Sequence, residues 1–323
     1  MRCALRPADH VSWALESLAN EGFVVRVVLA ITRWRWVKWV FTRTRVGRRV
    51  SLRFVAGETL NEAIRVALDA NEAGMSVSLN LLGEHVGDEV AARACFDSYV
   101  AAIDELQICG VDGNISVKLT QLGLVLDEQL CEALVGDLAQ RAAGVGTTLT
   151  VDMEDSTLTD GTIDIYERVQ SANGNLGIAL QAYLKRTPAD LARIAPLGGH
   201  IRLCKGAYDE PELIAFRSRR QVNDAYDALM ASLIDDEGLL PGLATHDYAR
   251  VDAAIAAAKG RTAPYEFQML FGIREPLQER LVADGLALRS YIPYGEAWYP
   301  YLTRRMAERP ANLWFFIRAL FSR

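Results

Sequence analysis

The stretch His200-Ile201-Arg202-Leu203-Cys204-Lys205-Gly206 decides the fold. It is a short apolar run that ends at a glycine, which is typical of a buried parallel strand. Similar runs, bounded by Gly, Pro, Asn or Asp, recur along the chain. They predict eight strands, at 76–82, 115–119, 147–153, 177–182, 200–205, 242–245, 265–270 and 289–293.

Segments of helical character lie between these runs, for example over 88–106, 127–143 and 247–259. Thr187 is expected to cap a helix that opens on Pro188. Eight strands that alternate with helices indicate either a closed (β/α)8 barrel of the TIM type or a doubly wound open sheet, which are both α/β folds. The count of eight favours the barrel.

Nucleotide-binding motifs do not support the open sheet. No G-x-G-x-x-G follows the first strand and no Walker A sequence occurs, so a Rossmann or P-loop protein has no motif in its favour. We expect residues 1–56 to form an N-terminal helical, basic arm and residues 57–323 to form the barrel domain.

Composition narrows the class of protein. The chain has 323 residues, 50% of them hydrophobic, and a net charge of −6, so we expect a globular protein that does not bind nucleic acid in general. Its five cysteines are scattered and form no C-x-x-C, which argues against a disulfide framework or a zinc ribbon and for a reducing compartment. Neither a signal peptide nor a membrane-spanning helix is expected.

Residues 24–50 differ in charge from the rest of the chain. They hold eight basic residues and no acidic one, and Trp34, Trp36 and Trp39 lie among them. Basic and aromatic side chains together suit an anionic membrane surface. The alternative is a helix packed on the body of the protein, with its arginine heads reaching water.

Polar residues gather where the predicted strands end. In a barrel these ends and the loops after them form the active face. The set comprises Glu84, Lys118, Asp152, Gln181, Arg202, Lys205, Thr245, His246, Glu266, Gln268 and Tyr291. Each has a structural alternative: Lys118 and Asp152 can form an ion pair, and His246 can help to cap the next helix. Together they indicate a site, because buried strands rarely carry ionisable groups without a reason.

Two further patterns suggest ligands. Arg304 and Arg305 offer two planar guanidinium groups to a carboxylate or phosphate, although an exposed helix face is the simpler interpretation. Arg202 and Lys205 before Gly206 suit a phosphate-bearing cofactor or a ring that accepts a hydride. No metal site is expected, because the four histidines are far apart and lack metal-binding spacing.

Nine collinear motifs together resemble one family. They are Phe54–Thr59, Asn80–Glu84, Ser116–Thr120, Val151–Asp155, Gln181–Arg186, Arg202–Tyr208, Ala244–Asp247, Glu266–Gln268 and the run Tyr291–Arg305. The chain is similar to the FAD-dependent proline dehydrogenases, in their short bacterial monofunctional form. The resemblance implies a distorted (β/α)8 barrel that oxidises L-proline to Δ1-pyrroline-5-carboxylate. FAD then takes the hydride and a membrane quinone takes the electrons.

The resemblance also implies residue roles. Arg304, Arg305 and Lys118 match the cations that clamp the proline carboxylate. Tyr291 matches the residue that packs on the proline ring, and Glu84 matches the acid that pairs with one arginine and helps to close the site. Asp152 and Arg202 match catalytic positions, with Arg202 close to the flavin N5. Flavin contacts are matched by Met153, Gln181, Arg202, Lys205, Gly206, Ala207, Thr245 and His246.

Two positions depart from the family pattern, with Asn80 where many relatives have Asp and Asp209 where longer relatives often have Trp. The resemblance further implies a separate pyrroline-5-carboxylate dehydrogenase downstream. It also implies a cytoplasmic protein that is peripheral at the inner face of the cell membrane.

Three alternatives stay open at this point. One is another FAD barrel, of the methylenetetrahydrofolate reductase type. The second is a non-catalytic barrel that serves as a binding module, and the third is a nucleic-acid role for the arm.

Overall fold

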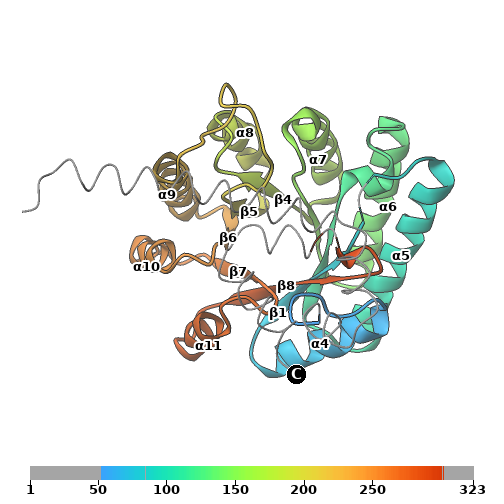
Figure 1. Cartoon of the computed structure of the whole chain (residues 1–323), viewed down its shortest axis with the longest axis horizontal. Coiled ribbons are helices and arrows are strands. Elements are labelled where there is room, and N and C mark those ends of the chain that lie inside the picture. Colours follow the sequence, from blue (N-terminus) through green and yellow to red (C-terminus); the bar gives the residue numbers. More distant parts are fainter. Residues whose placement is uncertain (1–51, 84, 300, 302–323) are drawn as a thin grey trace, which may run out of the picture. The chain divides into compact units, whose positions relative to one another are not determined.

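The computed structural model describes residues 52–83, 85–299 and 301. Residues Ala56–Gly295 form one compact unit, a closed barrel of eight parallel strands (Figure 1). The remaining described residues belong to a second unit. The strands are β1 (Ser76–Leu81), β2 (Gly113–Val117), β3 (Leu149–Val151), β4 (Leu176–Gln181), β5 (Gly199–Cys204), β6 (Leu239–Ala244), β7 (Glu266–Leu270) and β8 (Leu288–Tyr294).

Each strand pairs in parallel with the next one along the chain, and β1 pairs with β8 to close the barrel. Helices lie around the outside of the strands (Figure 1). They are α4 (Leu60–Glu72), α5 (Glu89–Ile108), α6 (Glu128–Gly144), α7 (Thr159–Asn173), α8 (Thr187–Ile194), α9 (Arg219–Asp235), α10 (Tyr248–Ala257) and α11 (Glu275–Ala283). Short 3₁₀ turns occur at Leu119–Leu122, Ser156–Leu158 and Ala195–Leu197. The predicted barrel is confirmed, and every predicted strand overlaps an observed one.

Side-chain oxygens start several of the helices. Asp88, Asp127 and Asp247 each accept a backbone N–H of the first turn of α5, α6 and α10. The cap predicted at Thr187 is wrong. Its hydroxyl donates to the carbonyl oxygen of Gln181 at 2.6 Å, and Arg186 is the cap residue of α8. The hydroxyl thus ties the start of α8 to the end of β4.

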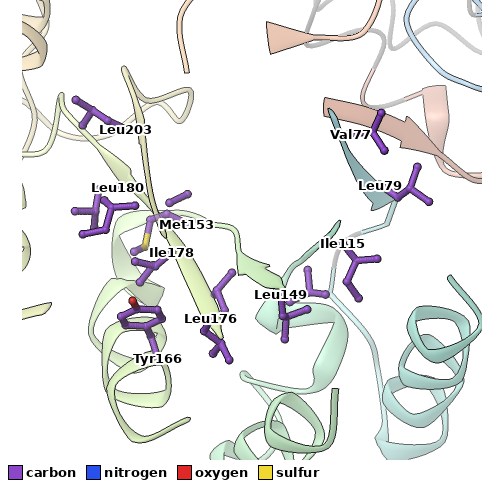
Figure 2. Packing of buried hydrophobic residues seen from close by; sticks show 14 of the residues in the cluster. Val77, Leu79, Ile115, Leu149, Met153, Tyr166, Leu176, Ile178, Leu180 and Leu203 are labelled. Carbon is purple, nitrogen blue, oxygen red and sulfur yellow. The ribbon is translucent and has the colours of Figure 1, made fainter. Parts of the chain in front are cut away.

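The outer faces of the strands are apolar and pack under the helices. Leu79, Ile115, Leu149 and Ile178 are almost fully buried there, and Tyr166 of α7 lies in the same cluster (Figure 2). Burying one such side chain contributes about 1.5–3 kcal/mol. This layer therefore provides much of the free energy that holds the barrel closed.

Most strands have polar inner faces, unlike the bulky branched residues that usually fill such a barrel. The buried polar side chains that alternate with the apolar ones are Ser78, Asn80, Asn114, Ser116, Thr150, His200, Arg202, Glu266 and Gln268. They are hydrogen-bonded to one another: Asn114 Nδ2, for example, donates to Thr150 Oγ1 at 3.1 Å. Such groups are tolerated in the interior because they have partners.

Two glycines make room for the large polar side chains. A Cβ on Gly177 would lie 2.8 Å from His200 Nδ1. A Cβ on Gly242 would lie 2.5 Å from Gln268 Nε2 and 2.6 Å from His200 Nε2. These distances are shorter than real Cβ contacts, so both positions need the absence of a side chain.

Gly242→Ala is expected to lower the free energy of unfolding by about 1–3 kcal/mol, since it overpacks a dense interior. Gly136 of α6 is a matched control, because a Cβ there meets nothing within 4 Å. Gly136→Ala is expected to raise stability by about 0.5–1 kcal/mol. Denaturant unfolding of both variants checks this, and a Gly242→Ala protein as stable as the wild type would contradict the packing described here.

Candidate active site

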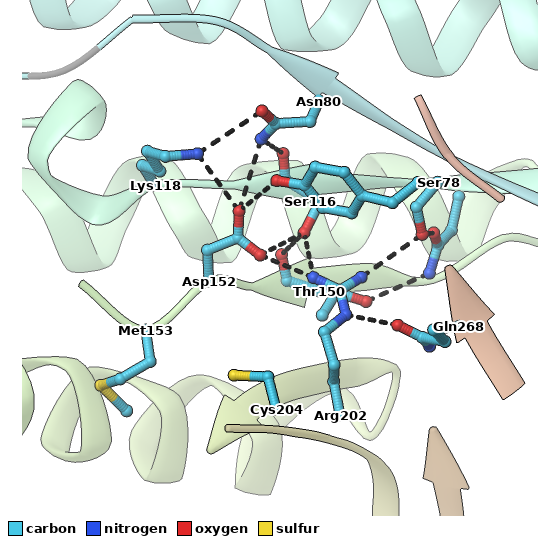
Figure 3. A network of polar contacts seen from close by, with 12 residues as sticks. Ser78, Asn80, Ser116, Lys118, Thr150, Asp152, Met153, Arg202, Cys204 and Gln268 are labelled. Carbon is cyan, nitrogen blue, oxygen red and sulfur yellow. Dashed lines mark hydrogen bonds and ion pairs between the residues drawn. The ribbon is translucent and has the colours of Figure 1, made fainter. Parts of the chain in front are cut away.

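A single carboxylate organises the polar residues at the carboxyl ends of the strands. Asp152 directly follows β3, and its Oδ1 accepts from Ser116 Oγ at 2.7 Å and from Arg202 Nη1 at 2.6 Å. Its Oδ2 accepts from Lys118 Nζ at 3.2 Å and from Tyr291 Oη at 2.7 Å. Figure 3 shows Lys118 and Arg202 approaching Asp152 from two sides. Lys118, Asp152, Arg202 and Tyr291, predicted together from the sequence, therefore do come together.

Asp152 is held in its ionised form. Burial alone would raise the pKa of its carboxyl group. The charges of Lys118 and Arg202, with the hydrogen bonds from Ser116 and Tyr291, outweigh burial and lower that pKa below its usual value. Two cations against one carboxylate leave the Lys118–Asp152–Arg202 cluster with a net charge of about +1, which favours an anion nearby.

Arg202 is buried and has several partners. Besides Asp152, its Nη1 donates to Ser116 Oγ at 2.8 Å, and its Nε donates to Gln268 Oε1 at 2.5 Å. Its guanidinium carbon lies 5.1 Å from the centre of the Tyr291 ring. A planar group fixed by this many contacts keeps one orientation.

Asn80, the position that departs from the family pattern, belongs to the same cluster. Its Nδ2 donates to the carbonyl oxygen of Ser116 at 3.1 Å and lies 3.4 Å from Asp152 Oδ2, while Lys118 Nζ lies 3.5 Å from its Oδ1. An aspartate here would place a second negative charge beside Asp152. The asparagine thus preserves the positive balance of the cluster.

The residues expected to contact a flavin lie around the ends of β3 to β6. Met153 is buried beside Asp152, and Ala207 is exposed. Gln181 is buried, and its Nε2 donates to the backbone oxygen of Glu154 at 3.1 Å. Among the described residues its Oε1 has no hydrogen-bond partner.

Lys205, Thr245 and His246 have structural partners. Lys205 Nζ forms an ion pair with Asp247 at 3.0 Å and donates to Asn223 Oδ1 at 2.6 Å. Thr245 Oγ1 accepts from the backbone N–H of Asp247 at 3.1 Å. His246 Nε2 accepts from the backbone N–H of Leu270 at 2.9 Å, so the imidazole ties the end of β6 to the end of β7. The ion pair weighed as the structural alternative for Lys118 and Asp152 is thus present. The helix cap weighed for His246 is not what this contact provides: the imidazole bonds to the end of β7, and the cap of α10 is Asp247.

Gly206 has a packing role. Its φ is +110°, and a Cβ would lie 2.1 Å from the ring of Tyr183. The space left by the missing side chain is therefore occupied by Tyr183. Next to it lies a cavity of about 240 Å³, lined in part by Tyr183, Lys205, Tyr208, Phe216 and Arg217.

Some predicted residues cannot be placed. Glu84, Arg304 and Arg305, and the basic segment 24–50, lie outside the described residues. Asp209, the second departure from the family pattern, is exposed and forms an ion pair with Arg217 at 2.7 Å.

Within residues 52–83, 85–299 and 301, no three His, Cys, Asp or Glu side chains are grouped as a metal ion would need. In the same part of the chain no helix combines the length and the apolar character needed to cross a bilayer.

Sequence reasoning missed Ser116 and assigned no role to Glu266 and Gln268. A signal was present in the sequence, because Ser116 and Lys118 are two residues apart in one predicted strand, as Glu266 and Gln268 are in another. Residues at i and i+2 of a strand point to the same face. Polar alternation within an otherwise apolar strand therefore indicates an interior hydrogen-bond network.

Fold and site together define a class: an enzyme built on a (β/α)8 barrel, with a buried ion cluster at the carboxyl ends of its strands. The family model described as proline dehydrogenase matches residues 63–318. Proline dehydrogenase 1 of Bacillus subtilis subsp. natto is 33% identical over 280 residues, which are 86% of this chain and 91% of that protein. Proline dehydrogenase of Deinococcus radiodurans is 33% identical over 277 residues, 83% of this chain and 89% of that protein. The chain belongs to the proline dehydrogenase family.

Solved structures agree on the fold. Proline utilization A (PutA) from Bdellovibrio bacteriovorus matches with a TM-score of 0.76 at 22% identity, over 81% of this chain and 33% of that chain. A mutant PutA from Bradyrhizobium japonicum matches with a TM-score of 0.73 at 27% identity, over 87% of this chain and 33% of that chain. The chain spans about a third of the length of these PutA chains. The family predicted from the motifs, and the barrel predicted with it, are both confirmed.

The lowered pKa of Asp152 gives a testable pH dependence. A carboxyl group with a lowered folded pKa stabilises the fold above its unfolded pKa, about 3.9, and loses that contribution as pH falls through the folded value. Asp152→Asn is expected to cost about 3–5 kcal/mol of stability near pH 7, because it leaves buried cations uncompensated. The difference in unfolding free energy between wild type and variant should stay constant from about pH 7 to 5 and shrink below about pH 4. Denaturant unfolding at a series of pH values checks this, and a difference that shrinks already between pH 7 and 5 would contradict it.

Proposed function

We propose that this chain oxidises L-proline to Δ1-pyrroline-5-carboxylate with FAD as its cofactor. The main support for this proposal is the cluster of Lys118, Asp152 and Arg202 at the carboxyl ends of the strands, which has a net positive charge, in a chain of the proline dehydrogenase family. Such a cluster attracts a carboxylate, and proline is a small amino acid with one carboxylate beside a ring.

The residues around the ends of β3 to β6 fit a flavin. The buried Gln181 Oε1, which lacks a donor among the described residues, suits a ring N–H of the bound cofactor. Arg202 supplies a positive charge for a ring that becomes more negative on reduction. FAD, when bound, supplies the hydride acceptor. The residues that we propose to contact it are Met153, Gln181, Arg202, Lys205, Gly206, Ala207, Thr245 and His246.

For the substrate we propose a clamp of three cations. Lys118, Arg304 and Arg305 hold the proline carboxylate, which fixes the ring by two planar guanidinium groups and one ammonium. Tyr291 packs against the proline ring and leaves no room for a 4-hydroxyl group. Glu84 pairs with one of the arginines and helps to close the site over the substrate. Holding the reacting atoms at about 3–3.5 Å is the main contribution of such a clamp.

Asp152 acts in this proposal by holding its neighbours. A carboxylate whose pKa is lowered is a weak base, so it is a poor acceptor for a proton from the proline ammonium. The proline ammonium therefore gives its proton to solvent before the hydride leaves, because only a free nitrogen lone pair can form the C=N bond. The hydride leaves the ring carbon next to nitrogen, on the side away from the carboxylate, the nitrogen lone pair forms the C=N bond, and the nitrogen proton is released to solvent. Asp152 meanwhile keeps Lys118, Arg202 and the Tyr291 hydroxyl in place.

The proposed function is tested by an absorbance spectrum of the purified protein before and after anaerobic addition of L-proline. We expect flavin bands that bleach with proline, because two electrons pass from the substrate to the cofactor. Flavin bands that stay unchanged would exclude proline as the substrate and keep a flavin barrel. A colourless protein that cannot be reconstituted with FAD would overturn the proposal.

We further propose that a membrane quinone takes the electrons and that a separate pyrroline-5-carboxylate dehydrogenase consumes the product. The eight basic residues of 24–50, with their three tryptophans, support contact with an anionic bilayer, hence a cytoplasmic protein peripheral at the inner face of the cell membrane.

Flotation with phosphatidylglycerol vesicles tests the membrane contact. We expect the full chain to float with these vesicles and not with phosphatidylcholine, and binding to weaken when Arg43, Arg45, Arg48 and Arg49 are replaced by glutamine. Equal flotation of this variant and the wild type, or binding to duplex DNA in preference to vesicles, would contradict the assignment of 24–50.

A further inference from the structure

A second charged cluster lies inside the barrel, on the far side of Gln268 from Arg202. Glu266 Oε1 accepts from Arg289 Nε at 2.7 Å and from Gln268 Nε2 at 2.6 Å. His200 Nε2 lies 2.9 Å from the same Gln268 nitrogen. Arg289 also donates to the carbonyl oxygen of Val77 at 2.9 Å. Glu266, Gln268 and His200 are buried, so these contacts are shielded from water.

Glu266 is ionised in this setting. Burial opposes its charge, but His200 and Arg289 outweigh burial and lower the pKa of its carboxyl group. Burial keeps His200 neutral by lowering its pKa. An ionised carboxylate only accepts hydrogen bonds. The amide of Gln268 must therefore present its nitrogen to Glu266.

The orientation of the Gln268 amide also determines which of its atoms faces Arg202. With Nε2 directed at Glu266, Oε1 faces Arg202 and accepts from Nε at 2.5 Å. The guanidinium group is planar, so fixing Nε also fixes the direction of the terminal nitrogens. Nη1 is thereby directed at Asp152 Oδ1, 2.6 Å away. Figure 3 shows Arg202 between Gln268 and Asp152.

We infer that Gln268 and Glu266 are positioning residues for the oxidation: ionised Glu266 locks the Gln268 amide, and the locked amide sets the orientation of Arg202. This inference rests on the proposed function, since Arg202 is there the cation beside the flavin. Neither residue touches substrate or cofactor in this account. Their effect is to keep the charge of Arg202 in one place, where it stabilises the reduced ring.

Gln268→Met removes the acceptor of Arg202 Nε while keeping a side chain of similar length. We expect the flavin midpoint potential to become more negative and kcat/KM for proline to fall about 10–100-fold, as when a supporting partner of a functional group is lost. Gln278→Met is the matched control. Gln278 is also buried, and its Nε2 donates to the carbonyl oxygens of Leu270 at 3.1 Å and Ile273 at 2.8 Å, away from Arg202. This variant is expected to lose stability and to keep the wild-type potential.

Glu266→Gln gives an independent test, because an amide can donate or accept and so no longer locks Gln268. We expect the same negative shift of potential, and no further shift when Glu266→Gln is added to Gln268→Met. Additive shifts would show that Glu266 does not act through Gln268, and would overturn the inference. A Gln268→Met protein with the wild-type potential, or a Gln278→Met protein with the same shift, would overturn it as well.

The flavin of the wild-type protein, and its reduction by proline, show whether a failed test concerns the proposed function or only the positioning role. If its flavin is absent or is not reduced by proline, the proposed function fails. If the wild type behaves as proposed and the variants keep its potential, only the positioning role of Glu266 and Gln268 fails. The potential is read by dye equilibration and does not depend on turnover.

Discussion

The ionised carboxylate of Asp152 is the interaction on which the rest of the site depends. Two cations, Lys118 and Arg202, converge on it within 3.2 Å and 2.6 Å, and the Tyr291 hydroxyl donates to it at 2.7 Å. Bringing charges into a barrel costs several kcal/mol per ion unless each has a partner with good geometry. Asp152 is that partner for both cations, and it still leaves about one positive charge uncompensated. The site is therefore stable before any ligand arrives and remains attractive to a carboxylate.

The barrel makes this arrangement possible through its two-residue period. On β1, β2, β3, β5 and β7, one face supplies apolar side chains to the helices and the other supplies polar side chains to the interior. Gly177 and Gly242 provide the volume that His200 and Gln268 occupy. As a result, polar contacts run from Asp152 through Arg202 and Gln268 to Glu266. The interior thus connects the carboxyl ends of the strands to a second charged cluster within the barrel.

The strands of the barrel and the central residues of the site could be predicted from the sequence. Buried parallel strands are short apolar runs with clear limits, so the eight strands were predicted close to their observed bounds, and Lys118, Asp152, Arg202 and Tyr291 were predicted together. The family followed from collinear motifs.

What a single sequence could not show was which hydrogen-bond partners the side chains share. The Thr187 hydroxyl bonds back to β4 instead of capping α8, and the space at Gly206 is used by Tyr183. Arg202 lies on β5, and Glu266 and Gln268 lie on β7, with β6 between the two strands. The contact between Arg202 and Gln268 across the barrel interior is therefore encoded by no local pattern.

The ionisation of Asp152 is measured directly by titrating its carboxyl carbon by ¹³C NMR in the full chain, with Asp152→Asn used to assign the signal. We expect a carboxylate with a pKa below the ordinary value of about 3.9, which stays ionised above that value. A carboxyl group that takes up a proton at or above that value would show that Lys118, Arg202 and Tyr291 do not stabilise its ionised form, and that the site does not depend on this charge.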